Sequence, residues 1–377
     1  MYIWQSPQWP EFQVDLVALQ PALTAARYAQ GRVMGLASHL QLMDLGDLQL
    51  QGWADEAIAT AKIEGEILQV NSVRASAARR LGLQDAKPLA RDARTEATLD
   101  LLQAAIEQSQ QPLTHDTLHG WQAALFPNGR SGIQKIRTGA YRDHAEPMQI
   151  VTPRLGKPDI VHYQAPDSAD VPAQMTGLID WFNNNQSQTD GLVRAALAHL
   201  WLEAIHPFED GNGRVGRALV EMALAQDLKT DKRLWSLSQQ MWLDRAGYYA
   251  QLQAATGQAN MDVTPWVQWF VGCVHKAADA TWDQMQTALR KTRFWTELRE
   301  QHPQLTPTQT KAINKLYDVG PDGFANGIST EKYVNLCRVS RATAYRELTA
   351  LCEMGVLVQT GTGRGTRYKL GDLLSCR

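Results

Sequence analysis

The segment His206-Pro-Phe-Glu-Asp-Gly-Asn-Gly-Arg-Val-Gly-Arg217 decides the fold that we expect of this chain and the chemistry that the fold would support. An apolar helical pattern comes before it, Pro207 interrupts that pattern, and a second apolar helix is predicted from Arg214. Two glycines flank Asn212 at the predicted helix start, so consecutive backbone N–H groups can point at one place, where the helix dipole adds about half a positive charge. The segment therefore predicts a phosphate-binding nest between two helices.

Four side chains of this segment add chemistry to the nest. Arg214 and Arg217 are three residues apart in the first helical turn, so we expect both guanidinium groups on a similar face, donating to phosphate oxygens. Asp210 supplies the hard oxygen ligand that Mg²⁺ prefers, and His206 can take up a proton near neutral pH. Together they predict a phosphate-transfer centre, and the GxxxxGK[ST] pattern of a Walker A loop is absent.

Periodicity along the rest of the first 300 residues predicts a mainly α-helical protein. A change of character between residues 126 and 166 predicts a two-stranded hairpin, with strands near Met148–Val151 and Asp159–Tyr163 and a turn near Pro153 to Pro158. The predicted helices cover residues 15–43, 72–83, 96–107, 171–183, 192–205 and 214–227.

The residues after a polar linker at 299–304 predict a separate module at 303–377. Helices are expected at 306–317, from Ser329, and from Ser340 to Gly355, followed by two β-like runs within 356–370. This order is typical of a winged helix, which either binds DNA or serves only protein packing and dimerisation. The residues that DNA would contact are Arg341, Thr343, Tyr345 and Arg346 on the third helix and Arg364, Arg367 and Lys369 on the wing.

Charge and composition limit the class of protein to which this chain can belong. Residues 303–377 carry ten Lys or Arg against six Asp or Glu, so the net charge of -2 divides into +4 on this module and -6 on the rest. No apolar stretch is long enough to span a bilayer and no secretory signal opens the chain, so a cytoplasmic location without membrane contact is expected. The four cysteines, Cys273, Cys337, Cys352 and Cys376, form no CxxC pair and are expected to be reduced.

The segment at 206–217 matches the whole HPFx[DE]GNGRxxR signature of the Fic family, and the chain resembles a Fic-domain protein adenylyltransferase. The resemblance implies a Fic-type helical core at 111–295, preceded by a helical region at 1–110. It implies that His206 deprotonates a hydroxyl of a target protein, which then attacks the α-phosphorus of ATP, so that AMP is transferred. It also implies that Asp210 binds Mg²⁺, that Gly211, Asn212, Gly213 and Arg214 hold the α- and β-phosphates, and that Arg217 holds the γ-phosphate.

Three further regions support the resemblance. The hairpin at about 147–164 stands where the family has a flap that clamps the target's main chain by strand addition, which implicates Gln149, Ile150 and Val151. Tyr248 and Tyr249 stand where family members contact adenosine, although packing in the core is an equal alternative. The opening residues resemble a subgroup that also has a C-terminal winged helix, and for this subgroup a homodimer is a candidate assembly.

Thr60-Ala-Lys-Ile-Glu-Gly65 fits the [ST]xxxE[GN] motif of the family's inhibitory helix, which we expect at about 54–69. A carboxylate of Glu64 paired with Arg217 would occupy the donors that the γ-phosphate needs. We therefore expect Glu64, with Thr60, to repress transfer and to be a candidate for orienting water in the removal of AMP.

Three alternatives stay open beside this interpretation. Some Fic-like proteins transfer phosphate, phosphocholine or UMP instead of AMP. The chain could also be a DNA-binding regulator whose core senses a nucleotide. A metal hydrolase would use His199 and His206, which are seven residues or two helical turns apart, but Pro207 breaks the helix there.

Overall fold

A computed structural model describes residues 1–39, 42–83, 91–152, 154, 158–319, 324 and 327–371. The chain forms two compact units, residues 1–283 and 284–377, so the region predicted at 1–110 does not separate from the core. The boundary lies inside helix α11 (Thr264–Gln301), and the linker predicted at 299–304 is therefore partly helical. The helix continues because no proline or glycine occurs between Gly272 and Pro303.

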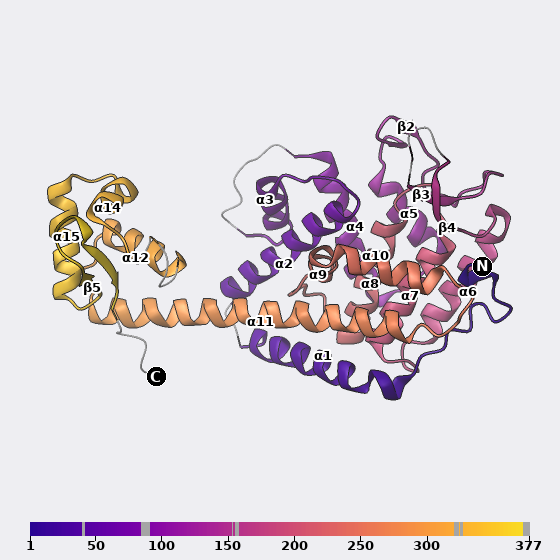
Figure 1. Cartoon of the computed structure of the whole chain (residues 1–377), viewed down its shortest axis with the longest axis horizontal. Helices are drawn as coiled ribbons and strands as arrows, with labels where there is room; N and C mark the ends of the chain where they lie inside the picture. The colour runs from indigo at the N-terminus through magenta and orange to yellow at the C-terminus, as the bar shows by residue number, and fades with distance from the viewer. Residues whose placement is uncertain are drawn as a thin grey trace. The chain divides into compact units, whose positions relative to one another are not determined.

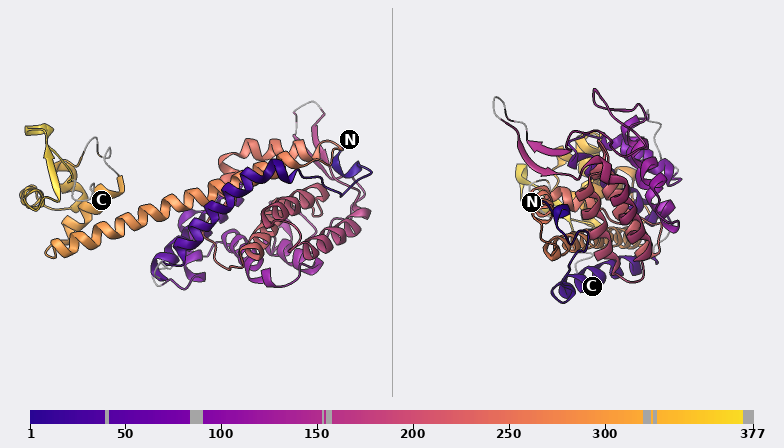
Figure 2. Two further views of the ribbon diagram at one scale, coloured as in Figure 1. Left: turned by 90° about the horizontal axis from the view of Figure 1, so that it is seen from below. Right: turned by 90° about the vertical axis from the view of Figure 1, so that its right-hand side faces the viewer.

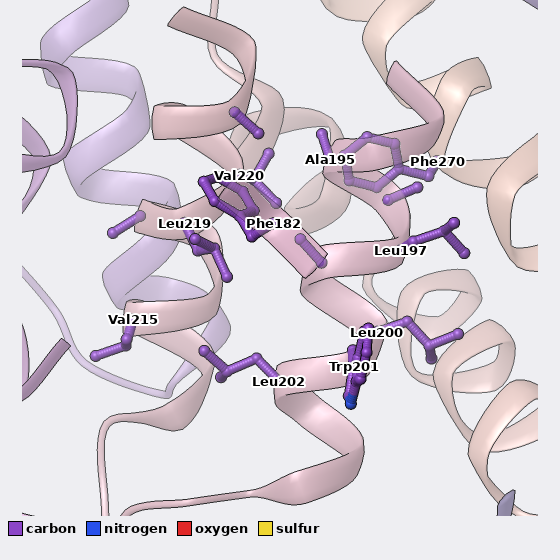
Figure 3. Packing of buried hydrophobic residues seen from close by; sticks show 14 of the residues in the cluster. Phe182, Ala195, Leu197, Leu200, Trp201, Leu202, Val215, Leu219, Val220 and Phe270 are labelled. Atoms are coloured by element: carbon purple, nitrogen blue, oxygen red, sulfur yellow. The ribbon is translucent and has the colours of Figure 1, made fainter. Parts of the chain in front are cut away.

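Helices α7 (Gly191–Ile205) and α8 (Asn212–Leu228) form the centre of the first unit (Figure 1). Every residue of α7 except Glu203 is buried, as expected for a helix that is apolar on all sides. The two helices approach closely at Gly216, where an added Cβ would lie 2.8 Å from the imidazole of His199. Figure 3 shows apolar side chains of both helices meeting in this core. The close packing fixes the two helix ends that carry the 206–217 segment.

The remaining helices of the first unit surround this pair. Helix α1 (Leu16–Ala37) lies beside the first part of α11 (Figure 2), where Arg32 pairs with Asp279 at 2.5 Å. The helix predicted at 15–43 ends at Ala37, and a second helix follows it. The others agree with their predicted positions where one was made: α3 (Val70–Arg80), α4 (Ala93–Glu107), α5 (His115–Leu125), α6 (Val171–Asn184), α9 (Leu237–Leu243) and α10 (Arg245–Thr256).

The helix that carries most of the Thr60–Gly65 segment, α2 (Leu42–Ile63), begins and ends earlier than the range 54–69 predicted for it. It stops because Gly65 adopts a left-handed conformation with φ of 78°. The N–H of Gly65 then donates to the carbonyl of Lys62, and the N–H of Glu66 donates to that of Ala61, which is the hydrogen-bond pattern of a Schellman motif. Glu64 is thus the capping residue at the end of α2 rather than a residue within the helix.

Two small hairpins lie on the first unit. Strands β3 (Gln149–Thr152) and β4 (Ile160–Gln164) pair antiparallel, which confirms the predicted hairpin; most of its predicted turn lies outside the described residues. A shorter hairpin of β1 (Arg130–Ser131) and β2 (Gln134–Lys135) was not predicted, because two-residue strands leave no alternating pattern.

The second unit contains the three helices and the hairpin that the sequence predicts for it. They are α12 (Pro307–Val319), α14 (Thr330–Cys337), α15 (Arg341–Glu353), β5 (Leu357–Thr360) and β6 (Arg367–Leu370). Ile328 adds an antiparallel bridge to Tyr368 of β6, and buried residues of all three helices form a separate core. Helix α15 ends two residues before Gly355, which adopts φ of 74°. None of the helices in the described part of the chain could cross a membrane.

Candidate functional site

The loop between α7 and α8 is held in shape by its own side chains. His206 ends α7 in a left-handed conformation with φ of 50°, and Gly211 precedes α8 with φ of 90°. The Asn212 side chain accepts a hydrogen bond from the Phe208 N–H at 2.9 Å and donates one to the Phe208 carbonyl at 2.8 Å. Phe208 is fully buried beneath the loop. These contacts aim the start of α8 at the cavity described next.

A cavity of about 490 Å³ opens beside this loop. It brings together residues that the sequence placed more than 180 positions apart, from the end of α2 to α10. Seven predicted site residues line it: Glu64, Ile150, His206, Gly213, Arg217, Tyr248 and Tyr249. The residues that sequence reasoning missed are His162, Tyr163, Glu203, Leu252, Gln253 and Thr256. These have no motif of their own, and only the packing of α7, α10 and β4 brings them here.

The carboxylate of Glu64 occupies the anion-binding end of α8. Its Oε1 accepts a hydrogen bond of 2.6 Å from Arg217 Nη2 and lies 2.3 Å from the position of a Cβ at Gly213. Arg217 Nε also donates to the Thr60 hydroxyl at 2.7 Å. Burial alone would raise the pKa of Glu64, but the charges of Arg217 and Arg214 outweigh it and hold this pKa below its usual value. The carboxylate is therefore ionised where an anionic ligand would bind.

Arg214 and Arg217 form ion pairs with different acids, although the sequence predicts that both side chains project on a similar face. Its Nη1 donates to Glu66 at 3.1 Å, and its guanidinium lies over the ring of Phe126, 5.0 Å from the ring centre. Its Nη2 is 3.7 Å from the carboxylate of Asp210, which also accepts a hydrogen bond from Ser131. Arg217 therefore pairs with Glu64, and Arg214 pairs with Glu66 two residues further along the chain.

His206 is held as a neutral imidazole. Burial, and then the charge of Arg142, lower its pKa to about 4. Arg142 is itself buried, and its Nε donates to the His206 carbonyl at 2.8 Å. The carboxylate of Glu203 lies 3.9 Å from His206 Nδ1, and burial followed by the charge of Glu64 raises the pKa of Glu203 to about 7. Glu203 lies three residues before His206 on α7, whereas Arg142 is brought to His206 by the tertiary structure.

The two tyrosines of α10 differ in their surroundings. Tyr248 is buried, and its hydroxyl lies 2.9 Å from Nε2 of His199, whose ring stacks on it. Tyr249 is half-exposed, and its hydroxyl donates to the backbone carbonyl of Ile63 at 3.1 Å. Arg245, which the sequence did not single out, donates to the same carbonyl at 3.1 Å. Both tyrosines therefore line the cavity, and Tyr249 also contacts the end of α2.

The hairpin of β3 and β4 presents an exposed surface next to this cavity. Gln149, Ile150 and Val151 are all exposed, and Ile150 also lines the cavity. Tyr163 of β4 fixes the base of the hairpin, because its hydroxyl donates to the Ala204 carbonyl of α7 at 2.6 Å. The exposed strand β3 therefore lies next to the cavity.

Among the described residues, no group of three or more His, Cys, Asp or Glu side chains could hold a metal ion. His199 faces Tyr248, so it does not join His206 in the pair that a metal hydrolase would use. Asp210 is the carboxylate that the 206–217 segment itself contributes beside the nest.

Comparison with known proteins agrees with the motif. The Fic/DOC family matches residues 112–224, and a domain of unknown function (DUF4172) matches residues 2–83. The protein adenylyltransferase fic-1 of Caenorhabditis elegans is 31% identical over 148 residues, 39% of this chain and 26% of that protein. The protein adenylyltransferase Fic of Nematostella vectensis is 26% identical over 199 residues, 48% of this chain and 44% of that protein. The chain thus spans less than half the length of these relatives.

Solved structures extend the similarity to most of the chain. A Fic family protein from Desulfovibrio desulfuricans G20 superimposes with a TM-score of 0.52 at 21% identity, covering 93% of this chain and 96% of that one. A Fic domain containing signaling protein from Bacteroides thetaiotaomicron also reaches 0.52, at 18% identity, covering 68% of this chain and 95% of that one. At these identities the likeness concerns the fold. The motif, the family match and the fold together establish that residues 112–224 of this chain are a Fic domain.

Proposed function

We propose that this chain is a protein adenylyltransferase that moves AMP from ATP to a Ser, Thr or Tyr hydroxyl of a target protein. The observation that carries the proposal is the joint presence of His206, Gly213 and Arg217 in one cavity with Tyr248 and Tyr249. A proton acceptor, a helix start with free N–H groups, a guanidinium and aromatic rings are what a nucleoside triphosphate and an attacking hydroxyl require. The names of the relatives are consistent with this chemistry.

In the proposed reaction each residue has one task. The adenosine lies against the two tyrosines, and the phosphates lie over the first turn of α8, within reach of the N–H groups of Gly211, Asn212 and Gly213. The target is held by strand addition to Gln149–Val151. His206 takes the proton of the target hydroxyl, whose oxygen bonds to the α-phosphorus as pyrophosphate leaves. The lowered pKa of His206, about 4, leaves the imidazole free to accept a proton at pH 7.

Asp210 fits a bound Mg²⁺ ion. Magnesium is usually held by one or two carboxylates together with substrate phosphates and water, so the carboxylate of Asp210 is sufficient. The contacts of Asp210 with Ser131 and Arg214 fix the direction of its carboxylate. When bound, the ion would neutralise phosphate charge.

We further propose that Glu64 restrains transfer. Its carboxylate already uses the Arg217 donor that the γ-phosphate needs, and it fills the space over Gly213. Two anions cannot share this position, because their repulsion in a buried site is large. The same carboxylate lies beside the nest, where it would orient water against an AMP ester, so removal of AMP is the second direction that we assign to this site.

The test is label transfer by the full chain with Mg²⁺ and α-³²P-ATP. We expect strong self-labelling by Glu64→Gly, little by wild type, and none when His206→Ala is added to Glu64→Gly. Glu11→Gly, an exposed acid outside the site, is the control and should behave like wild type. If no variant gains label from ATP or from α-³²P-UTP, the proposal is wrong.

A second candidate function, DNA binding, is favoured by the exposed face of α15. Arg341, Tyr345 and Arg346 are all exposed on this helix, and Ser340 caps its start by accepting a hydrogen bond from the Thr343 N–H. Basic and aromatic residues on an exposed third helix suit the major groove. If the helix contacts DNA, binding of a fluorescent duplex by the full chain should weaken with salt, and Arg341→Ala with Arg346→Ala should reduce the log–log salt slope by about two. An unchanged slope would exclude this surface.

A further inference from the structure

Arg214 is not among the residues that line the His206 cavity, although the motif implies that it holds the α- and β-phosphates of ATP. The residue before it, Gly213, does line that cavity. Arg214 instead lines a second cavity, of about 470 Å³, and Glu66 lines this second cavity with it. The two cavities share no lining residue, so Arg214 and Glu66 meet outside the space proposed for the nucleotide.

The contact between Arg214 and Glu66 is a charge-assisted hydrogen bond in a partly buried place. Arg214 Nη1 donates to Glu66 Oε1 at 3.1 Å, and the guanidinium is held over the ring of Phe126. The side chain of Arg214 is 7% exposed and that of Glu66 is 29% exposed, so solvent screens this pair less than a fully exposed pair. Glu66 therefore uses one donor of Arg214 and neutralises part of its charge.

The turn that ends α2 places Glu66 as firmly as it places Glu64. The two acids flank Gly65, whose left-handed conformation closes the turn. The N–H of Glu66 donates to a carbonyl in the last turn of α2 at 2.9 Å, which fixes the backbone from which its side chain projects. Glu64 then reaches Arg217 at 2.6 Å, and Glu66 reaches Arg214. One turn thus delivers a carboxylate to each of the two arginines of the motif.

We propose that Glu66 is a second restraint on the site, which withholds Arg214 from the phosphates of ATP. Glu64 withholds Arg217 in the same way, and this inference rests on the proposed binding of ATP for AMP transfer. The carboxylate of Glu66 occupies a donor that a phosphate oxygen needs, and its negative charge repels the phosphates. Because both acids belong to one turn, a movement of that turn would free both arginines together.

The test measures binding of ATP with Mg²⁺ to the full chain by calorimetry. Glu64→Gly and His206→Ala are present throughout, so that Arg217 is free and no transfer takes place. Adding Glu66→Gln should tighten ATP binding about fivefold, since glutamine keeps the shape and the backbone N–H but removes the charge. Glu107→Gln, at an exposed acid of α4 that lines neither cavity, is the matched control. It should change the affinity by less than about twofold.

Two further measurements show whether the effect passes through Arg214 and the phosphates. Adenosine, which has no phosphate, should bind equally well with and without Glu66→Gln. With Arg214→Gln also present, Glu66→Gln should lose most of its effect on ATP, because the guanidinium that it would release is gone. Unchanged or weaker ATP binding in Glu66→Gln would overturn the proposal, as would an equal gain for adenosine or an equal gain without Arg214.

These measurements separate the restraint by Glu66 from the proposed AMP transfer, because they use an inactive chain. If Glu66→Gln tightens ATP binding but Glu64→Gly gains no label, the restraint stands and AMP transfer fails. If Glu64→Gly gains label but Glu66→Gln leaves ATP binding unchanged, AMP transfer stands and the restraint by Glu66 fails. Absence of ATP binding in every variant would overturn both.

Discussion

The hydroxyl of Tyr249 donates a hydrogen bond of 3.1 Å to the backbone carbonyl of Ile63, the residue before Glu64. Arg245 donates to the same carbonyl at 3.1 Å, and its guanidinium lies over the Tyr249 ring. The last carbonyls of a helix lack partners within the helix, so these donors cap the end of α2. A side chain that lines the His206 cavity thus holds the backbone that positions the Glu64 carboxylate.

Tyr249→Phe should release this restraint while keeping the aromatic ring. Loss of one hydrogen bond of about 1 kcal/mol predicts a rise of about fivefold in self-labelling with α-³²P-ATP. In a Glu64→Gly background the same substitution should give no further rise, because no carboxylate remains to be positioned. Tyr28→Phe, at an exposed tyrosine of α1, is the control and should leave labelling unchanged. Equal rises with and without Glu64 would argue against this coupling.

Thr60→Val should destabilise the first unit. The Thr60 hydroxyl accepts from Arg217 Nε at 2.7 Å, and both side chains are buried. Valine keeps the shape but leaves a buried charged donor without a partner, which costs about 1–3 kcal/mol of unfolding free energy. Urea denaturation followed by tryptophan fluorescence measures this change. Thr60→Ser, which retains the hydroxyl, should lose much less, and a similar loss in both variants would assign the effect to packing.

The pH dependence of transfer should reflect the lowered pKa of His206. A general base works in its neutral form, and this group is neutral above its pKa of about 4 rather than above the usual 6.5. The rate of self-labelling by Glu64→Gly should therefore stay level as the pH falls from 7.5 to 5.5 and decline only near pH 4. A midpoint of the acidic limb near 6.5 would show that His206 is not held neutral.

Glu56→Gln should loosen the attachment of α2 to the core. The carboxylate of Glu56 is fully buried, accepts hydrogen bonds from Ser236 and Ser238, and lies 3.8 Å from Arg233. Removing the charge of one partner in a buried charge network typically lowers the free energy of unfolding by about 3 kcal/mol, which urea denaturation would detect. Asp55→Asn, at the adjacent and partly exposed acid, should cost less than about 1 kcal/mol. If both variants lost the same free energy of unfolding, burial of Glu56 would not be the cause.

The sequence alone determined the mainly helical class, the nest at 206–217 and the hairpin beside it, because each depends on local patterns. Helical periodicity, paired glycines around Asn212 and alternating β-branched residues are properties of neighbouring residues. The same local reasoning failed at helix ends. The end of α2 depends on the left-handed turn at Gly65, and the length of α11 on the absence of a helix breaker before Pro303.

Only the tertiary structure decided which groups share the site. Glu64 and Arg217 lie 153 positions apart, and their contact follows from the packing of α2 against the core. The same packing gives Arg214 and Arg217 different partners, Glu66 and Glu64, although their spacing of three residues predicts a similar face. It also brings Arg245 to the end of α2, while the packing of the 142 region against α7 places Arg142 on the His206 carbonyl. Burial and long-range charge set the pKa of His206, and neither is a property of nearby sequence.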